Sequence, residues 1–372
     1  MNREKSIRVA VGLSGGVDSA VSALLLKKQG YEAVGVHLYC WPPKSEIEKD
    51  GLTRAEWIKK NGCRADEDKA VALKTALELD IPFKTLDFSE EYNRRVVDYF
   101  YREYEAGRTP NPDVLCNSEI KFGLFLQWAL ENGFDYVATG HYAKLSDSRL
   151  MIPKDKHKDQ TYFLWKLTAK ELKHVLFPLA DLMKTEVRKI AKKAGLSIAD
   201  RPDSQGICFV GNVPARRFLA RRLDEKKGNV KNTAGEVIGT HVGVWFYTIG
   251  QRGGWRLTAA AQREYVKKEK TPIFYVISKD AKKNELVVGV GKETERQEFG
   301  VEEVSWISGP VPQLQSVAVR IRHGGKLIPV KIVKRSDLLT VKLAEAQRGV
   351  APGQSAVFYA KGGEMLGGGV IG

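Results

Sequence analysis

The first stretch able to do chemistry is a turn rich in glycine and serine at residues 12–19, GLSGGVDS. Because glycine lacks a Cβ, such a turn can adopt unusual backbone angles and aim several N–H groups at one anion. A helix expected over 20–29 would direct the positive end of its dipole to the same place. Ser14 and Ser19 add hydroxyl donors, and Asp18 is a candidate to help hold a divalent cation. A phosphate-binding loop is therefore predicted, because a tight turn that binds nothing has little use for these polar groups.

Cys116 is the first of two cysteines whose neighbours bear on their chemistry. It follows two closely spaced prolines, which predict an extended loop. A helix is expected over 119–131, capped by Asn117 or Ser118, so the thiol would lie near a helix N-terminus. There the helix dipole lowers a thiol pKa and makes the sulfur a better nucleophile. A buried structural cysteine is the alternative, and the residues alone leave both interpretations open.

Cys208 follows a glycine in the apolar stretch 203–210, and composition by itself favours a buried structural thiol there. The segment 158–163, KDQTYF, mixes charged and aromatic side chains. It suits stacking or clamping of a nucleic-acid base, and equally an ordinary helix start. Cys40 and Cys63 match no catalytic pattern and are interpreted as structural thiols. With no CxxC pair, the four cysteines do not predict a zinc site.

The residues around these groups alternate between apolar strands and amphipathic helices. The expected strands are 7–13, 31–39, 82–87 and 136–140, and the expected helices are 20–29, 53–60, 66–80, 89–105 and 119–131. Such alternation predicts βαβ units and an open parallel sheet, in which ligands bind at the carboxyl ends of the strands. The loop at 12–19, Leu38 and Gly140 all fall at that edge.

The second half of the chain loses this alternation from about residue 211. A short basic helix is expected over 213–223, followed by a glycine-punctuated, β-rich stretch at 230–255. From residue 271 onward, short Val/Ile runs recur between Gly, Pro and charged residues, which predicts a small β-barrel. The predicted domains are residues 1–211 (nucleotide-binding), 212–273 (small and central) and 274–372 (β-barrel).

Arg320 and Arg322 alternate with Val319 and Ile321 on one predicted barrel strand, so both arginines are expected on the same face. Contact with RNA phosphates is one interpretation, and a solvated face of an edge strand is the other.

The composition describes a soluble globular protein with a surplus of positive charge. Of its 372 residues 43% are hydrophobic, and the net charge is +15. A polyanion binder gains affinity and association rate from such charge, although a generally basic proteome is the alternative. No apolar run predicts a membrane span, and no targeting peptide has room before the first strand. The expected location is the cytoplasm.

Five motifs occur together and in order: SGGVDS at 14–19, NPDVLCN at 111–117, TGHY at 139–142, KDQ at 158–160 and DSQGICF at 203–209. This set resembles the tRNA-specific 2-thiouridylase family of ATP pyrophosphatases, and the likeness runs to the end of the chain. The loop accordingly lacks both the GxxxxGK[ST] lysine and the GxGxxG spacing. The resemblance implies an open parallel sheet of the adenine-nucleotide alpha-hydrolase type, a small central domain and a C-terminal β-barrel.

The resemblance also implies a reaction: AMP is transferred to the C2 oxygen of the wobble uridine at tRNA position 34, and sulfur then replaces that oxygen. Cys208 would carry a persulfide and Cys116 would complete the exchange, leaving a Cys116–Cys208 disulfide after each turnover. Asp113 would act as general acid or base. ATP and Mg²⁺ are the implied cofactors. The implied partners are tRNAs of the Lys, Glu and Gln type and a persulfide sulfur-donor protein.

The resemblance assigns binding residues position by position. Those implied for ATP are Gly12, Leu13, Ser14, Gly15, Gly16, Val17, Asp18, Ser19, Leu38 and Gly140. Those implied for tRNA are Asn111, Pro112, Asp113, His141, Lys158, Asp159, Gln160, Arg320, Ile321 and Gln354. The family commonly has Tyr where this chain has Ile321, which leaves backbone contact or shape at that position.

Three alternatives remain at this stage. Another ATP pyrophosphatase could adenylate a small molecule without using thiols. A non-catalytic RNA-binding protein could retain a vestigial loop. Iron–sulfur ligation by Cys116 and Cys208, with Asp113 or an outside ligand, is a further alternative, although the sequence has few clustered thiols for it.

Overall fold

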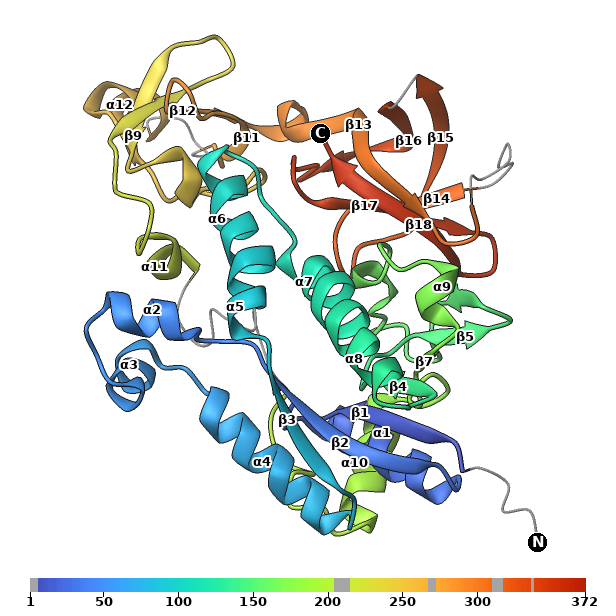
Figure 1. Ribbon diagram of the computed structural model, residues 1–372. Coiled ribbons are helices and arrows are strands. Elements are labelled where there is room, and N and C mark those ends of the chain that lie inside the picture. The colour runs from blue at the N-terminus through green and yellow to red at the C-terminus, as the bar shows by residue number, and fades with distance from the viewer. Residues whose placement is uncertain (1–5, 204–214, 267–271, 310–316, 336–337) are drawn as a thin grey trace, which may run out of the picture.

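The computed structural model describes residues 6–203, 215–266, 272–309, 317–335 and 338–372 (Figure 1). Three sheets organise these residues: a five-stranded parallel sheet, a five-stranded mixed sheet and an eight-stranded antiparallel sheet. In Figure 1 the parallel sheet lies at the bottom, the mixed sheet at the upper left and the antiparallel sheet at the upper right.

The parallel sheet has the strand order β3-β2-β1-β4-β7. Its strands are β1 (Arg8–Gly12), β2 (Glu32–Tyr39), β3 (Phe83–Asp87), β4 (Tyr136–Ala138) and β7 (Val175–Leu176). Both faces of β1 are buried, because Val9 and Val11 pack in one apolar core and Ala10 packs in another. The predicted open parallel sheet is thus confirmed, and burial on both faces explains the nearly continuous apolar run.

Helices cover both faces of this sheet. On one face lie α1 (Val17–Lys28), α4 (Ala65–Glu78) and α10 (Lys184–Lys193), whose apolar residues share a core. On the other face lies α8 (Phe125–Glu131), whose core also takes in Val357 and Tyr359 from the antiparallel sheet. The nucleotide-type domain and the C-terminal sheet are therefore packed against each other through one continuous core.

The predicted helix over 89–105 is present as α5 (Ser89–Tyr92), a π-helical turn (Asn93–Val97) and α6 (Asp98–Glu105). The helix predicted over 53–60 is α3 (Arg54–Asn61), with a Thr53 capping box, and α2 (Lys44–Lys49) precedes it. Helix α10 was not among the predicted elements. Val187, Ile190 and Ala191 repeat at helical spacing, and this periodicity was the available signal.

The extended loop predicted around Cys116 is wrong. A helix begins at Pro112 as α7 (Pro112–Leu115), continues as the π-helical segment Cys116–Leu124 and ends as α8. Asn111 is its N-cap residue. Proline suits the first helical position, because its fixed φ is helical and its missing N–H has no partner there in any helix.

The mixed sheet contains two strands that sequence analysis assigned to the barrel. Its order is β10-β9-β8-β12-β11, with β8 (Gly228–Lys231), β9 (Val237–His241), β10 (Arg256–Leu257), β11 (Tyr275–Asp280) and β12 (Glu285–Gly289). Strand β12 pairs in parallel with β8, and Val276 and Leu286 share a core with Val230. The assignment of β11 and β12 to the barrel was wrong, because an apolar run predicts a strand but not the sheet that it joins.

The antiparallel sheet closes into a barrel of six strands. These are β13 (Glu295–Trp306), β14 (Val317–Arg320), β15 (Ile328–Arg335), β16 (Leu338–Arg348), β17 (Ser355–Ala360) and β18 (Glu364–Ile371), and β13 also pairs with β18. The hairpin β5 (Lys144–Ser146) and β6 (Arg149–Met151) extends the sheet through β18. In the described part of the chain, no helix is both long and apolar enough to span a bilayer.

Candidate nucleotide and thiol site

The glycine- and serine-rich loop joins β1 to α1 at the carboxyl edge of the parallel sheet. The hydroxyls of Ser14 and Ser19 lie 3.3 Å apart, and Ser19 also donates to the carbonyl of Gly16 at 2.9 Å. Gly16 is the N-cap of α1 and supplies no side chain to cap the helix. The first N–H groups of α1 therefore face the loop without a side-chain cap, as a phosphate site requires.

Two glycines are required by close packing around this loop. Gly15 has a φ of +78°, and a Cβ there would lie 2.8 Å from the carbonyl oxygen of Asp68. Gly140, just beyond β4, would place a Cβ 2.7 Å from the backbone nitrogen of Ser19 and 2.8 Å from the carbonyl carbon of Asp18. The segment after β4 thus packs directly on the first turn of α1, and this contact places the TGHY motif against the SGGVDS motif.

We expect Gly140→Ala to weaken ATP binding about tenfold or more, because the added methyl must displace the first turn of α1. Isothermal titration calorimetry with ATP measures the loss, and a thermal melt checks that the variant is folded. Wild-type affinity in the folded variant would contradict the close packing inferred here.

Asp18 faces a lysine from a different part of the chain. Lys184 Nζ, at the start of α10, lies 2.7 Å from both carboxylate oxygens of Asp18. The Tyr142 hydroxyl donates to the same carboxylate at 3.0 Å. Sequence analysis missed Lys184, because it lies 166 residues from Asp18 in a helix that was not predicted.

Asp203, the first residue of the DSQGICF motif, anchors the next part of the site. It receives Lys158 at 2.8 Å, Lys184 at 2.8 Å and Arg188 at 2.7 Å. Although burial alone would raise the pKa of Asp203, its hydrogen bonds to Lys158 and Lys184 lower that pKa to about 2. The rest of the motif, including Cys208, lies outside the described residues.

Cys116 and Asp113 lie three residues apart on the helix that begins at Pro112, so they share a face. The Cys116 side chain packs beside Tyr92, Phe100 and other apolar groups. Burial raises the pKa of the Cys116 thiol, although Lys121 counteracts it, so of the two interpretations that the sequence left open the buried thiol fits and the lowered pKa does not. The reason is position: Cys116 is the fifth residue of the helix and is buried, rather than exposed at the helix N-terminus.

Lys121 is the second functional candidate that sequence analysis missed. The π-helical segment starting at Cys116 has a wide turn, which brings residues five apart onto one face. Burial raises the pKa of Asp113, and the charge of Lys121 opposes that rise. The same charge opposes the rise for Cys116. Lys121 is therefore the cation that makes both groups more acidic than burial alone would leave them.

We expect Lys121→Met to raise the pKa of the Cys116 thiol further, because the opposing positive charge is lost while burial remains. The rate of alkylation by iodoacetamide, measured against pH in a variant whose other cysteines are serine, should then rise at higher pH. Lys121→Arg, which keeps the charge, is the matched control. An unmoved pH profile in the methionine variant would refute the role given to Lys121.

His141 connects the nucleotide loop to the thiol-bearing helix. It follows Gly140, its Nδ1 lies 2.8 Å from the Thr139 hydroxyl, and its ring lies 5.8 Å from that of Phe122. Burial, assisted by the charge of Lys121, lowers the His141 pKa well below its usual value, so the ring is neutral at physiological pH. Leu38 lies half-buried at the end of β2, and Leu13 and Val17 are buried in the core.

The KDQ residues each bond to a different part of the fold. Lys158 pairs with Asp203, while Gln160 accepts a hydrogen bond from the Tyr142 backbone at 2.9 Å. Asp159, 3% exposed, forms an ion pair of 2.6 Å with Arg320 of the barrel. A short 3₁₀ helix, Thr161–Phe163, follows directly.

Two of the binding residues predicted in the barrel, Arg320 and Ile321, are buried rather than displayed on an exposed face. Arg320 is buried and Arg322 is exposed, so the prediction that both lie on one face is wrong. The strand ends at Arg320, and the alternation of a pleated strand ends with it. Ile321 is buried in the barrel core. Gln354 donates to the carbonyls of Thr109 and Pro110, at 2.9 and 3.1 Å, and so holds the backbone just before Asn111.

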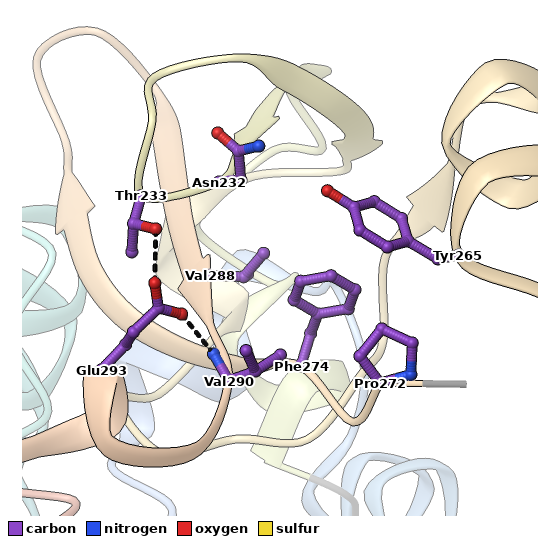
Figure 2. Close-up of a pocket in the computed structure, with 8 residues that line it drawn as sticks. All are labelled: Asn232, Thr233, Tyr265, Pro272, Phe274, Val288, Val290 and Glu293. Carbon is purple, nitrogen blue, oxygen red and sulfur yellow. Dashed lines mark hydrogen bonds between the residues drawn. The ribbon is translucent and has the colours of Figure 1, made fainter. Parts of the chain in front are cut away.

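A pocket of about 240 Å³ lies in the mixed sheet, away from these residues (Figure 2). Its lining residues are Asn232, Thr233, Tyr265, Pro272, Phe274, Val288, Val290 and Glu293. The Glu293 carboxylate accepts hydrogen bonds from the Thr233 hydroxyl and the Val290 backbone, so it is already engaged. None of the predicted site residues that the structure describes lines this pocket.

Three family models match successive parts of the chain. Residues 7–212 match a model described as the tRNA methyl transferase HUP domain, 216–290 its PRC-barrel domain, and 296–371 an aminomethyltransferase beta-barrel domain. The parallel sheet and the first of these models define a HUP-domain protein, a class that uses ATP, with two further domains.

Curated relatives narrow the class. A protein of Limosilactobacillus reuteri named tRNA-specific 2-thiouridylase MnmA is 41% identical over 378 residues, which cover 98% of this chain and 95% of the relative. A relative of the same name from Lactobacillus delbrueckii is 42% identical over 377 residues, with the same coverage. The chain belongs to the tRNA-specific 2-thiouridylase (MnmA) family.

Proposed function

We propose that the protein is a tRNA-uridine 2-sulfurtransferase, which uses ATP to convert the wobble uridine at position 34 into 2-thiouridine. One observation carries this proposal: residues 139–142 pack against both the loop at 12–19 and the helix that carries Cys116. Gly140 packs on the first turn of α1, and the ring of His141 contacts Phe122, six residues after Cys116. A phosphate-binding loop and a buried thiol on one sheet edge suit activation followed by sulfur transfer.

The first chemical step is adenylation. The C2 oxygen of the uridine attacks the α-phosphorus of ATP, and the bond to the β-phosphate breaks, so that pyrophosphate leaves with the electron pair. The hydroxyls of Ser14 and Ser19 and the N–H groups at the start of α1 hold the phosphates. The uridine oxygen, a poor leaving group, thereby becomes part of AMP, which is a good one.

The second step is sulfur transfer. The terminal sulfur of a Cys208 persulfide attacks C2, and AMP leaves with the former C2 oxygen. The Cys116 thiolate then attacks the Cys208 sulfur, which breaks the persulfide S–S bond and leaves thiouridine and a Cys116–Cys208 disulfide. Cellular thiols reduce that disulfide before the next turnover. Asp113 exchanges a proton beside the base, a role to which its raised pKa is suited.

Mg²⁺ fits this site as a companion of the ATP phosphates. No group of three or more His, Cys, Asp or Glu side chains is arranged to hold a metal among the described residues. Mg²⁺ usually needs only one or two carboxylates together with substrate phosphates, and Asp18 at the loop supplies one. Bound there, it would neutralise charge on the phosphates.

The remaining parts of the proposal concern partners and location. The net charge of +15 favours a polyanionic substrate, here tRNAs of the Lys, Glu and Gln type. Asn111, Pro112, His141, Lys158, Gln160 and Gln354 are the tRNA-contact candidates that retain exposed surface or adjoin Asp113. The persulfide sulfur comes from a donor protein, and the site of action is the cytoplasm.

A reconstituted reaction tests this function. The full chain is incubated with a tRNA(Lys) transcript, ATP, MgCl₂ and sodium polysulfide, which supplies sulfur at the oxidation level of a persulfide, and digested nucleosides are analysed by mass spectrometry. We expect 2-thiouridine at position 34, pyrophosphate release that depends on tRNA, and loss of that release in Asp18→Ala. Pyrophosphate release without tRNA would instead favour a small-molecule substrate, which the named relatives do not favour. Cys208→Ser should adenylate without thiolating, and thiolation at the normal rate would refute its role.

A further inference from the structure

The nucleotide loop contains no lysine, yet a lysine side chain reaches it from α10. Lys184 Nζ lies 2.7 Å from both Asp18 oxygens and 2.8 Å from Asp203 Oδ1. Its side chain is only 12% exposed, whereas that of Asp18 is 30% exposed. The ammonium group is therefore largely enclosed, while the Asp18 carboxylate that it pairs with is more open to solvent.

The position of Lys184 is set by the scaffold. Lys184 is the first residue of α10, which packs along α1 through Val187 and Ala191 (Figure 1). Its backbone N–H donates to the buried carboxylate of Asp155 at 2.9 Å. The two helices thus hold the ammonium group beside the start of α1 independently of the ion pairs that it makes.

Asp203 is paired with more than one cation. Among the described residues, Lys158, Lys184 and Arg188 all form ion pairs with Asp203, and Lys184 also pairs with Asp18. The third nearby carboxylate, Asp155, accepts the backbone N–H of Lys184. Asp203 keeps two cations if Lys184 turns away, so Lys184 is a cation whose departure leaves Asp203 still paired.

We propose that Lys184 is the phosphate-binding lysine that the loop itself lacks, and that it binds the β- and γ-phosphates of ATP, the part that leaves as pyrophosphate. This inference rests on the proposed cleavage of ATP between its α- and β-phosphates. As that bond breaks, the electron pair and its negative charge move onto pyrophosphate, where a compact ammonium ion stabilises them. Asp18 is then free to face the cation that accompanies the phosphates.

Binding measurements separate this role from a purely structural ion pair. We expect Lys184→Met to weaken binding of ATP and of inorganic pyrophosphate about 10- to 100-fold by calorimetry, with MgCl₂ held constant. Binding of AMP, which lacks both terminal phosphates, should stay within about threefold, since it lacks the groups that Lys184 contacts. Lys184→Arg keeps the charge and should recover part of the affinity for pyrophosphate.

Lys154→Met is the matched control. Lys154 forms an ion pair of 3.0 Å with Glu186, which lies on α10 as Lys184 does. The Lys154 side chain is about half exposed, so its loss should leave all three affinities unchanged. Equal weakening of AMP, ATP and pyrophosphate, or no change in pyrophosphate binding, would overturn the proposal. Should Lys184→Met fail to fold in a thermal melt, Lys184→Arg decides: affinity for pyrophosphate closer to wild type than that of Lys184→Gln supports the role, and equal affinities refute it.

The outcome is independent of the sulfur chemistry. If the protein binds pyrophosphate through Lys184 but makes no 2-thiouridine, the proposed function fails and the role of Lys184 stands. If it thiolates tRNA while Lys184→Met binds pyrophosphate normally, the proposed function stands and this inference fails.

Discussion

Cys116→Ser is expected to lower formation of 2-thiouridine by about 10³-fold or more while pyrophosphate release continues. A serine hydroxyl cannot attack the Cys208 sulfur to form a disulfide, so the thiolated product is not released from the persulfide. Adenylation uses the loop at 12–19, which Cys116 does not contact, and should proceed. Mass spectrometry of tRNA nucleosides measures the first quantity, and a coupled assay of pyrophosphate measures the second.

Cys63→Ser is the matched control for that variant. Cys63 is half-buried against the same apolar cluster as Cys116, and burial likewise raises its pKa. It has no step in the proposed mechanism, so its replacement should leave thiolation near the wild-type rate. Comparable loss in both variants would mean that the cluster needs its thiols for packing. Normal thiolation by Cys116→Ser would remove Cys116 from the mechanism.

Arg320→Met is expected to destabilise the protein by about 3–5 kcal/mol, because it leaves the Asp159 carboxylate buried without its cation. Asp159 is 3% exposed, and among the described residues its carboxylate would keep only the hydrogen bonds that it accepts from the backbone N–H and the hydroxyl of Thr161. Urea denaturation of the full chain, followed by fluorescence of the buried tryptophans, measures the change.

Arg322→Met is the control for that variant, since Arg322 lies two residues away and is exposed. It should change stability by less than about 0.5 kcal/mol. The resemblance assigned Arg320 to tRNA binding, and the two roles give different results. If Arg320 served only as a phosphate contact, Arg320→Met would reduce the salt dependence of tRNA binding and leave the urea denaturation midpoint unchanged. That result would show that the buried pair contributes little to folding.

The elements that the sequence predicted best are those set by nearby residues. The loop at 12–19 follows from glycines, hydroxyls and a carboxylate within eight residues, and β1 and α1 flank it as expected. Strand β2 and helix α4 follow from the spacing of their own apolar residues. The start of the Cys116 helix was misjudged, although its signal was local: proline also favours the first turn of a helix.

The sequence by itself determined the class of this protein, because its motifs are contiguous and their chemistry depends on residue type and short spacing. Only the tertiary structure decided which charges meet. It brings Lys184 to Asp18 across 166 residues and pairs Arg320 of the barrel with Asp159. It also buries Cys116, so that the pKa of the thiol rises. Desolvation and Coulomb interactions depend on distances through space, and packing between distant segments sets those distances.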